Sequence, residues 1–165
     1  MPMSAAVTVR AASPSDVSTI LTLIQELADY EELRHECVAT AESLQTHLFG
    51  ARPAAEVLLA EADGQPVGFA LFFTSFSTFL ARPCLFLEDL YVRPGQRKLG
   101  AGRALLQGLA RVGRERHSGR IEWHVLTWNK LALDFYDRLG AKHMADWTMY
   151  RLDEAGMQLV AEPVA

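Results

Sequence analysis

The sequence PGQRKLGAGRALLQGLARVGRER (residues 94–116) sets a glycine-rich turn and a helix-like pattern directly behind a nearly continuous apolar run. The apolar run, CLFLEDLYV (residues 84–92), predicts a strand that is buried on both faces. The helix should continue to about Arg116, and IEWHVL (residues 121–126) then predicts another strand. This order predicts a strand–helix–strand unit, and therefore an α/β chain with a mixed sheet flanked by helices.

The rest of the chain supplies further strands and helices with recognisable ends. Ser13 is a candidate N-cap with Pro14 in the first helical position, and Gly140 should end the last helix. Asp63 and Gly64 form a hairpin turn signal between two apolar runs. Strands are expected at residues 7–10, 56–61, 67–75 and 147–152, and helices at residues 14–30, 40–49 and 130–139.

Length, charge and composition exclude several classes of protein. A chain of 165 residues is long enough for a buried core, so we expect a single domain over residues 1–165. Half of the residues are apolar and the formal net charge is −4, which gives no support to a nucleic-acid partner. No apolar run approaches the roughly 20 residues of a membrane span, and the N-terminus lacks a secretory signal pattern, so we expect a cytoplasmic protein without a membrane partner. Two cysteines and five scattered histidines indicate neither a disulfide framework nor a metal.

The glycine-rich turn is typical of an anion-binding site, because backbone N–H groups and the helix dipole converge at the start of the helix. The mononucleotide-binding motif is excluded, since Ala101 and Gly102 occupy its Lys and Ser/Thr positions. The dinucleotide fingerprint is excluded because Leu105 replaces its third glycine. An Arg-x-x-Gly-x-Gly turn over residues 97–102 remains, which fits either a phosphate or a solvated connection. Three basic side chains add positive charge there: Arg97, Lys98 and Arg103.

Two carboxylates, Glu88 and Asp89, interrupt the apolar strand just before this turn. Such groups are costly in a core unless they are hydrogen-bonded, paired with an arginine or open to a cleft. Neighbouring side chains of a regular strand point to opposite faces, so both can reach one cleft only if a bulge re-aims one of them.

The segment LTWNKLALDFYDRLGA (residues 126–141) carries the third informative feature. Asn129 can cap the helix that follows it. Phe135 and Tyr136 differ by about 100° around that helix, so a buried Phe135 would let Tyr136 reach a neighbouring groove. Tyr136 is equally compatible with an amphipathic surface position.

Together these features resemble the GCN5-related N-acetyltransferase family, and within it the diamine branch of spermidine/spermine and thialysine N-acetyltransferases. Four segments fall in that branch's order and spacing: LIQELADYEE (residues 23–32), LFLEDLYV (85–92), RKLGAG (97–102) and WNKLALDFYDRLGA (128–141). The resemblance implies a mixed, mostly antiparallel sheet of six or seven strands flanked by about four helices, with splayed central parallel strands. It also implies acetyl-CoA as cosubstrate and a homodimer.

The resemblance implies roles for individual residues. The pantetheine arm of the coenzyme would pair with the backbone of Leu90, Tyr91 and Val92, and an N–H near Leu90 would polarise the thioester carbonyl. Tyr136 would be the general acid, and Glu88 would accept the amine proton through water. The pyrophosphate and the other side of the arm would contact Arg97, Lys98, Leu99, Gly100, Ala101, Gly102, Arg103, Asn129, Ala132 and Tyr136. The acceptor pocket would contain Tyr30, Glu31, Glu88, Asp89 and Asp146.

The resemblance also bears on the acceptor, which would be a primary amine attacking acetyl-CoA directly in a ternary complex. Polyamine-acetylating members carry an acidic residue and a tryptophan where this chain has Thr78 and Leu80. We therefore expect a small cationic acceptor, such as a short diamine or a thialysine- or lysine-like amine. Two alternatives stay open: a peptide or protein N-terminal acetyltransferase, and a non-catalytic acyl-CoA-binding module.

Overall fold

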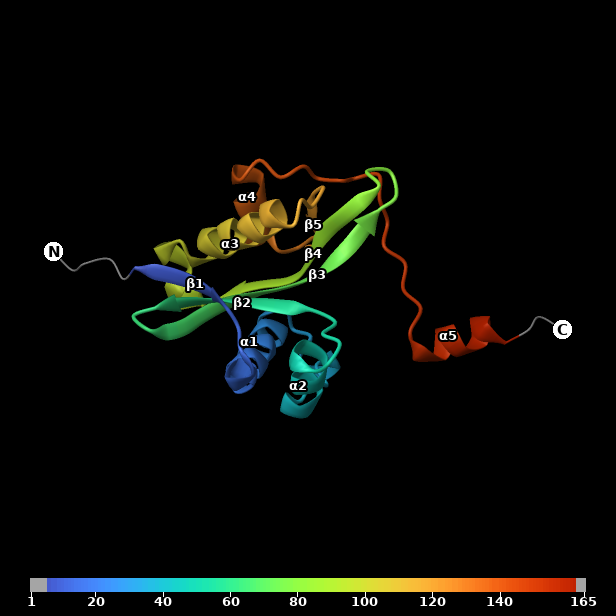
Figure 1. Ribbon diagram of the computed structural model, residues 1–165, viewed down its shortest axis with the longest axis horizontal. Helices are drawn as coiled ribbons and strands as arrows, with labels where there is room; N and C mark the ends of the chain where they lie inside the picture. Colours follow the sequence, from blue (N-terminus) through green and yellow to red (C-terminus); the bar gives the residue numbers. More distant parts are fainter. Residues whose placement is uncertain (1–5, 163–165) are drawn as a thin grey trace. The chain divides into compact units, whose positions relative to one another are not determined.

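The computed structural model describes residues 6–162, which contain a five-stranded sheet with the strands in sequence order (Figure 1). The first four strands pair antiparallel, and β5 pairs parallel with β4. The strands are β1 (Val7–Ala11), β2 (Glu56–Ala62), β3 (Gln65–Ser77), β4 (Arg82–Val92) and β5 (Ile121–Trp123).

Residues 6–162 also contain five α-helices: α1 (Val17–Tyr30), α2 (Ala41–Phe49), α3 (Ala101–Glu115), α4 (Lys130–Arg138) and α5 (Glu154–Ala161). Short 3-10 helices cover Pro14–Asp16, Arg34–Glu36 and Pro94–Leu99. The chain divides into two compact units, one ending at His124 and one beginning at Val125. The first unit holds the sheet with α1, α2 and α3, and the second holds α4 and α5. No helix among residues 6–162 is both long and apolar enough to cross a membrane.

The first unit has a core on each face of its sheet, because α3 covers one face while α1 and α2 cover the other (Figure 1). On the α3 face, Phe72, Leu85 and Leu105 are almost fully buried; on the α1 face, Ile20 and Phe69 are. The helix α3 approaches the sheet closely at Gly108, where a Cβ would lie 3.1 Å from Val9 Cγ1 and 3.2 Å from Leu58 Cδ1.

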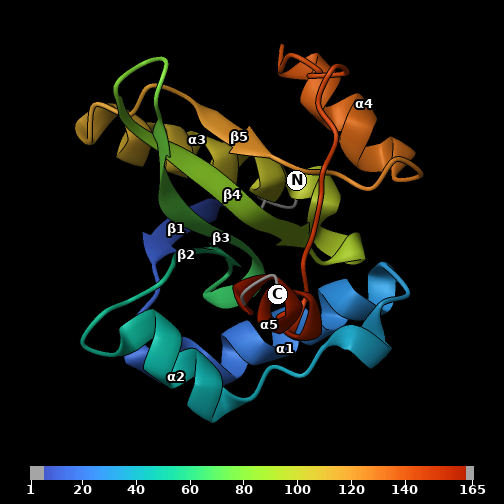
Figure 2. The same ribbon diagram turned by 90° about the vertical axis from the view of Figure 1, so that its right-hand side faces the viewer.

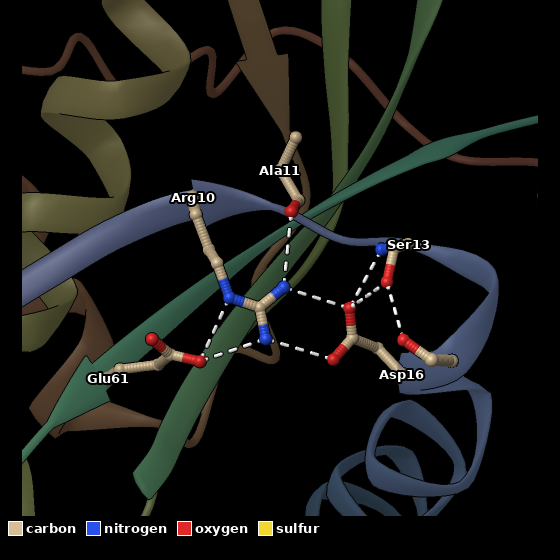
Figure 3. Close-up of polar contacts among 6 residues, drawn as sticks. Arg10, Ala11, Ser13, Asp16 and Glu61 are labelled. Carbon is tan, nitrogen blue, oxygen red and sulfur yellow. Dashed lines mark hydrogen bonds and ion pairs between the residues drawn. The ribbon is translucent and has the colours of Figure 1, made fainter. Parts of the chain in front are cut away.

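The side chain of Arg10, on the edge strand β1, links the sheet to the start of α1 through hydrogen bonds and ion pairs (Figure 3). Its Nη1 and Nη2 donate to Asp16 Oδ2 and Oδ1 at 2.8 and 2.9 Å, and its Nε donates to Glu61 Oε1 at 2.9 Å. Asp16 Oδ2 also accepts the backbone N–H of Ser13 at 2.7 Å, which completes a capping box. The hydrogen bonds from Arg10 hold the pKa of the Asp16 carboxyl well below its ordinary value. One cluster therefore joins β1, β2 and the N-terminal end of α1.

Most expected elements are confirmed. The hairpin turn lies at Asp63 and Gly64, which both have positive φ (50° and 73°), as the favoured two-residue turn requires. The strand expected at residues 121–126 ends earlier, at Trp123. The sheet of the described residues has five strands, so the expectation of six or seven is wrong.

The strand expected at residues 147–152 is absent, and α5 was not expected. A strand needs a neighbouring strand to bond its backbone groups, and no described residue pairs with residues 147–152. The strand-like pattern of WTMYRL is therefore insufficient to form a strand there. The single domain over residues 1–165 stays a prediction.

Candidate active site

The pairing of β4 with β5 ends halfway along β4. It runs from Leu85 opposite Ile121 to Leu87 opposite Trp123, whereas β4 continues for five residues to Val92. Figure 2 shows β5 along the edge of β4 opposite to β3. Beyond Leu87, no strand within residues 6–162 pairs with that edge. The splayed parallel strands are confirmed, and they leave a free strand edge that an extended molecule can bind.

Backbone alternation determines which groups face this free edge. The N–H of Arg93 donates to Val67 O at 2.9 Å, so Arg93 bonds toward β3. Successive residues of a strand direct their N–H and C=O groups to opposite edges. Leu90 and Val92 therefore present their backbone groups to the free edge, while those of Tyr91 face β3.

A bulge at Glu88 determines where Asp89 points. Leu71 lies opposite Asp89 and Phe72 lies opposite Leu87, so Glu88 is the additional residue. In an unbroken strand Asp89 would share the α3 face with Leu87, whereas beyond the bulge it shares the α1 face with Tyr91. Glu88 is exposed and Asp89 is half-buried. The structure contains the bulge that the sequence left open, and this bulge removes Asp89 from the α3 core.

Two carboxylates act on Asp89 around this bulge: Glu88 and Glu31, which directly follows α1. Burial, followed by the negative charges of Glu88 and Glu31, raises the pKa of Asp89 to about 7. Burial also raises the pKa of Glu31. Ionised together, these groups repel one another, so a cation beside them is stabilised. No group of three or more metal-ligating side chains is placed to hold a metal ion within the described residues.

The glycine-rich turn has the geometry of an anion site. Gly100 has a left-handed backbone (φ +81°), and no atom lies within 4 Å of the place where a Cβ would stand. The first helical hydrogen bond of α3 runs from Ala104 N to Gly100 O at 2.9 Å, so the N–H groups of Ala101, Gly102 and Arg103 precede it. The side chains of Lys98 and Arg103 are exposed. These residues fit a phosphate group at the N-terminal end of a 15-residue helix.

Arg97 makes two contacts that the sequence did not indicate. Its Nε donates to Val92 O at 2.9 Å, which occupies one carbonyl of the free edge. Its guanidinium carbon lies 4.7 Å from the centroid of the Tyr30 ring. The structure therefore brings Tyr30, expected in the acceptor pocket, against Arg97 of the expected coenzyme turn.

The remaining expected site residues belong to the second unit. The side chain of Asn129 accepts the N–H of Ala132 at 3.2 Å, which confirms the expected cap of α4. Tyr136 is half-buried, with its ring centroid 5.4 Å from that of Phe135, which is also half-buried. Asp146 is exposed.

The sequence also did not indicate a row of rings formed by β3, β4 and the residue that directly follows β5. The rings of Phe73 and Phe86 stack at 5.2 Å, and His124 meets Phe86 edge-on at 5.1 Å. By alternation from Phe72 and Leu87, Phe73 and Phe86 lie on the α1 face, as Asp89 does. The cross-strand register that assembles this row is not visible in the sequence. Thr78 and Leu80 lie at the exposed hairpin tip between β3 and β4.

Comparisons with known proteins agree with this geometry. Residues 21–141 match the family model described as the Acetyltransferase (GNAT) family. The thialysine N-epsilon-acetyltransferase of Bos taurus is 35% identical over 94% of this chain and 97% of its own length. The L-ornithine N5-acetyltransferase NATA1 of Arabidopsis thaliana is 29% identical over 92% of this chain and 86% of its own. An integron cassette protein from the mobile metagenome of V. cholerae shares the fold, with a TM-score of 0.80 and 22% identity over 98% of this chain and 99% of that one.

The raised pKa of Asp89 predicts a pH-dependent gain in stability for Asp89→Asn. The folded pKa of about 7 exceeds the ordinary value of 3.8, so the ionised form destabilises the fold. This cost is absent below pH 4, grows as the pH rises to 7 and is then constant. Urea unfolding should show equal stability of wild type and variant at pH 4 and a more stable variant at pH 8, by up to about 1.4 kcal/mol for each pH unit of the pKa difference.

Glu56→Gln is the control of opposite sign, because the hydrogen bonds from Arg116 lower the pKa of Glu56. Its ionised form stabilises the fold, so this variant should be less stable than wild type at pH 8 and similar near pH 3. An Asp89→Asn variant that is no more stable than wild type at pH 8 would contradict the inference that ionised Asp89 destabilises the fold.

Proposed function

Because the chain belongs to the acetyltransferase (GNAT) family, and is thus an acetyl-CoA-dependent N-acetyltransferase, we propose that it acetylates a primary amine of a short cationic molecule. A short diamine or a thialysine- or lysine-like amine fits this description. One observation carries the proposal: the bulge at Glu88 sets half-buried Asp89 beside the free edge of β4, within the influence of Glu31. The bovine relative is a thialysine acetyltransferase and the Arabidopsis relative is an ornithine acetyltransferase, which supports this class of acceptor.

The coenzyme would bind along β4 and at the N-terminal end of α3. Its phosphates would accept the N–H groups of Ala101, Gly102 and Arg103, with Lys98 and Arg103 adding positive charge. The pantetheine arm would pair with the free edge through Leu90 and the N–H of Val92. The N–H of Leu90 is also the candidate donor to the thioester oxygen, on which negative charge develops during attack.

The acceptor would lie on the α1 face of the sheet. The carboxylates of Asp89 and Glu31 would attract its distant ammonium group, and the half-exposed rings of Phe73 and Phe86 would contact its apolar chain. An alkylammonium with a pKa of about 10.4 is almost entirely protonated at neutral pH, so it must lose a proton before it attacks.

The chemistry requires one proton acceptor and one proton donor. The amine nitrogen bonds to the acetyl carbon as the carbon–sulfur bond breaks, so the amine releases a proton and the thiolate takes one up. We assign the first role to Glu88, acting through water, and the second to the phenol of Tyr136. Asn129 and Ala132 would line the coenzyme arm, and Asp146 would add a carboxylate to the acceptor pocket. A cytoplasmic homodimer is also part of the proposal.

Gly100→Ala tests the coenzyme turn, and Gly64→Ala is its matched control. Both glycines have positive φ with no atom within 4 Å of an added Cβ, so both variants should lose about 1 kcal/mol of stability through backbone strain alone. The Cβ at Gly100 would also obstruct the phosphates. Acetyl-CoA at a hundredfold excess over its Kd should raise the Tm of wild type and Gly64→Ala by roughly 5–10 °C, and that of Gly100→Ala far less. Equal shifts in all three proteins would refute the coenzyme turn.

Tyr136→Phe tests the general acid. The variant keeps the ring but lacks the proton donor, so kcat should fall by roughly 10²–10⁴ while the Kd of acetyl-CoA stays nearly constant. Assays of thiol release measure kcat, and calorimetric titration measures the Kd of acetyl-CoA. Tyr150→Phe, at an exposed tyrosine of the second unit, is the control and should retain wild-type turnover. Wild-type turnover in Tyr136→Phe would give the acid role to water or another group.

An amine panel tests the acceptor class and separates the two alternatives. Incubation with acetyl-CoA and short diamines, lysine, thialysine, ornithine, spermidine, spermine or peptides with free N-termini is followed by mass spectrometry. The best short amine should have a kcat/KM at least about tenfold above that of spermine, the effect of one contact worth roughly 1.4 kcal/mol. Asp89→Asn should raise the amine KM more than it lowers kcat. A panel in which spermine is the best substrate, in which only peptides react, or in which nothing reacts would refute the proposal.

A further inference from the structure

Two side-chain contacts join the last two turns of α1 to the chain between β4 and α3. Glu26 forms an ion pair with Arg93, whose Nη2 lies 2.9 Å from Glu26 Oε1. One turn further along α1, the ring of Tyr30 lies against the guanidinium group of Arg97. Both members of the second contact are four residues beyond those of the first, so the two contacts are successive.

The contact with Tyr30 fixes the orientation of Arg97. The guanidinium carbon lies 4.7 Å from the ring centroid, and Nε donates to Val92 O at 2.9 Å. Tyr30 packs against the buried cluster beneath α1, which includes Ile20, Leu27 and Tyr91, so the ring itself is held in place. An arginine held by a ring and by its Nε retains its two Nη groups for a further acceptor.

We infer that Tyr30 is a positioning residue for coenzyme binding. It holds Arg97 with its Nη groups available to the coenzyme phosphates at the glycine-rich turn. A free arginine side chain loses most of its rotamer entropy when it binds an anion, and one that is already ordered loses less. The inference rests on the proposed function, because it requires the coenzyme to bind at this turn.

Neighbouring residues at the end of α1 then reach both ligand sites. The ring of Tyr30 contacts Arg97 of the coenzyme turn, whereas the charge of Glu31 acts on Asp89 of the acceptor site. The resemblance to diamine acetyltransferases places both residues in the acceptor pocket. The contact with Arg97 gives Tyr30 an additional role at the coenzyme turn.

Calorimetric titration of coenzyme A into tyrosine and arginine variants tests this role. Tyr30→Leu removes the ring face and should raise the Kd of coenzyme A by about three- to fivefold, the range of a partly exposed cation–π contact. Tyr30→Phe keeps the ring face and should stay within about twofold of wild type. Arg97→Gln should raise the Kd at least as much as Tyr30→Leu, and Tyr30→Leu should have no further effect in the Arg97→Gln background. In Tyr30→Leu the Kd of coenzyme A should rise more than the KM of the amine.

Glu26→Gln is the matched control, because it weakens the neighbouring contact of α1 without removing the ring from Arg97. It should lower the Tm and leave the Kd of coenzyme A unchanged. A Kd raised equally by Glu26→Gln would overturn the inference, since loosening of α1 would then explain the effect of Tyr30→Leu. An unchanged Kd of coenzyme A in Arg97→Gln would also overturn the inference. This measurement can be made even if Tyr30→Leu does not fold.

Two more outcomes would overturn the inference. A raised amine KM with an unchanged coenzyme Kd in Tyr30→Leu would place Tyr30 in the acceptor pocket. Additive effects of Tyr30→Leu and Arg97→Gln would mean that the two side chains act independently. Failure of the wild-type chain to bind coenzyme A would instead refute the proposed coenzyme turn, so the two failures are distinguishable.

Discussion

The end of the β4–β5 pairing at Leu87 and Trp123 is the constraint on which the candidate site depends. A strand that stays paired on both edges cannot bind an extended ligand, because its backbone groups are already bonded. Here β4 keeps its bonds to β3 as far as Val92, while beyond Leu87 no strand of the described residues pairs with its other edge. The carboxylates, the free edge and the glycine-rich turn follow one another in this order along residues 88–102.

The bulge at Glu88 has an energetic consequence for this stretch. It moves Asp89 out of the α3 core and onto the α1 face, yet the carboxyl remains half-buried and close to two other carboxylates. Ionisation of Asp89 therefore opposes folding, and this cost is offset elsewhere in the first unit. Buried Phe69, Phe72 and Leu105 on the two faces of the sheet contribute hydrophobic stabilisation, and the Arg93–Glu26 ion pair holds α1 against the end of β4. A site that favours a cationic ligand is expected to be destabilising without it.

The end of α1 connects the two ligand sites of the proposed reaction. Glu26 and Tyr30 lie in its last two turns and contact Arg93 and Arg97, and Glu31, which directly follows it, acts on the charge of Asp89. Because α1 is anchored at its other end by the Arg10–Asp16 cluster, its position is fixed with respect to both β1 and β4. A rigid helix that spans the sheet in this way can hold the coenzyme turn and the acceptor carboxylates at a constant separation.

The sequence by itself determined the features that depend on neighbouring residues. Three such features are the Asp63–Gly64 turn, the cap formed by Asn129 and the glycine-rich turn at the N-terminal end of α3. Each involves residues only a few positions apart, so the local residue pattern is enough to predict it. The resemblance to the family also predicted the splayed strands. Tertiary structure alone decided that Asp89 faces α1, that Glu31 lies close enough to affect its charge and that Tyr30 stacks on Arg97. It also decided that residues 147–152 form no strand. These outcomes depend on contacts between distant segments, and the residue pattern of one segment does not specify which other segment it will meet.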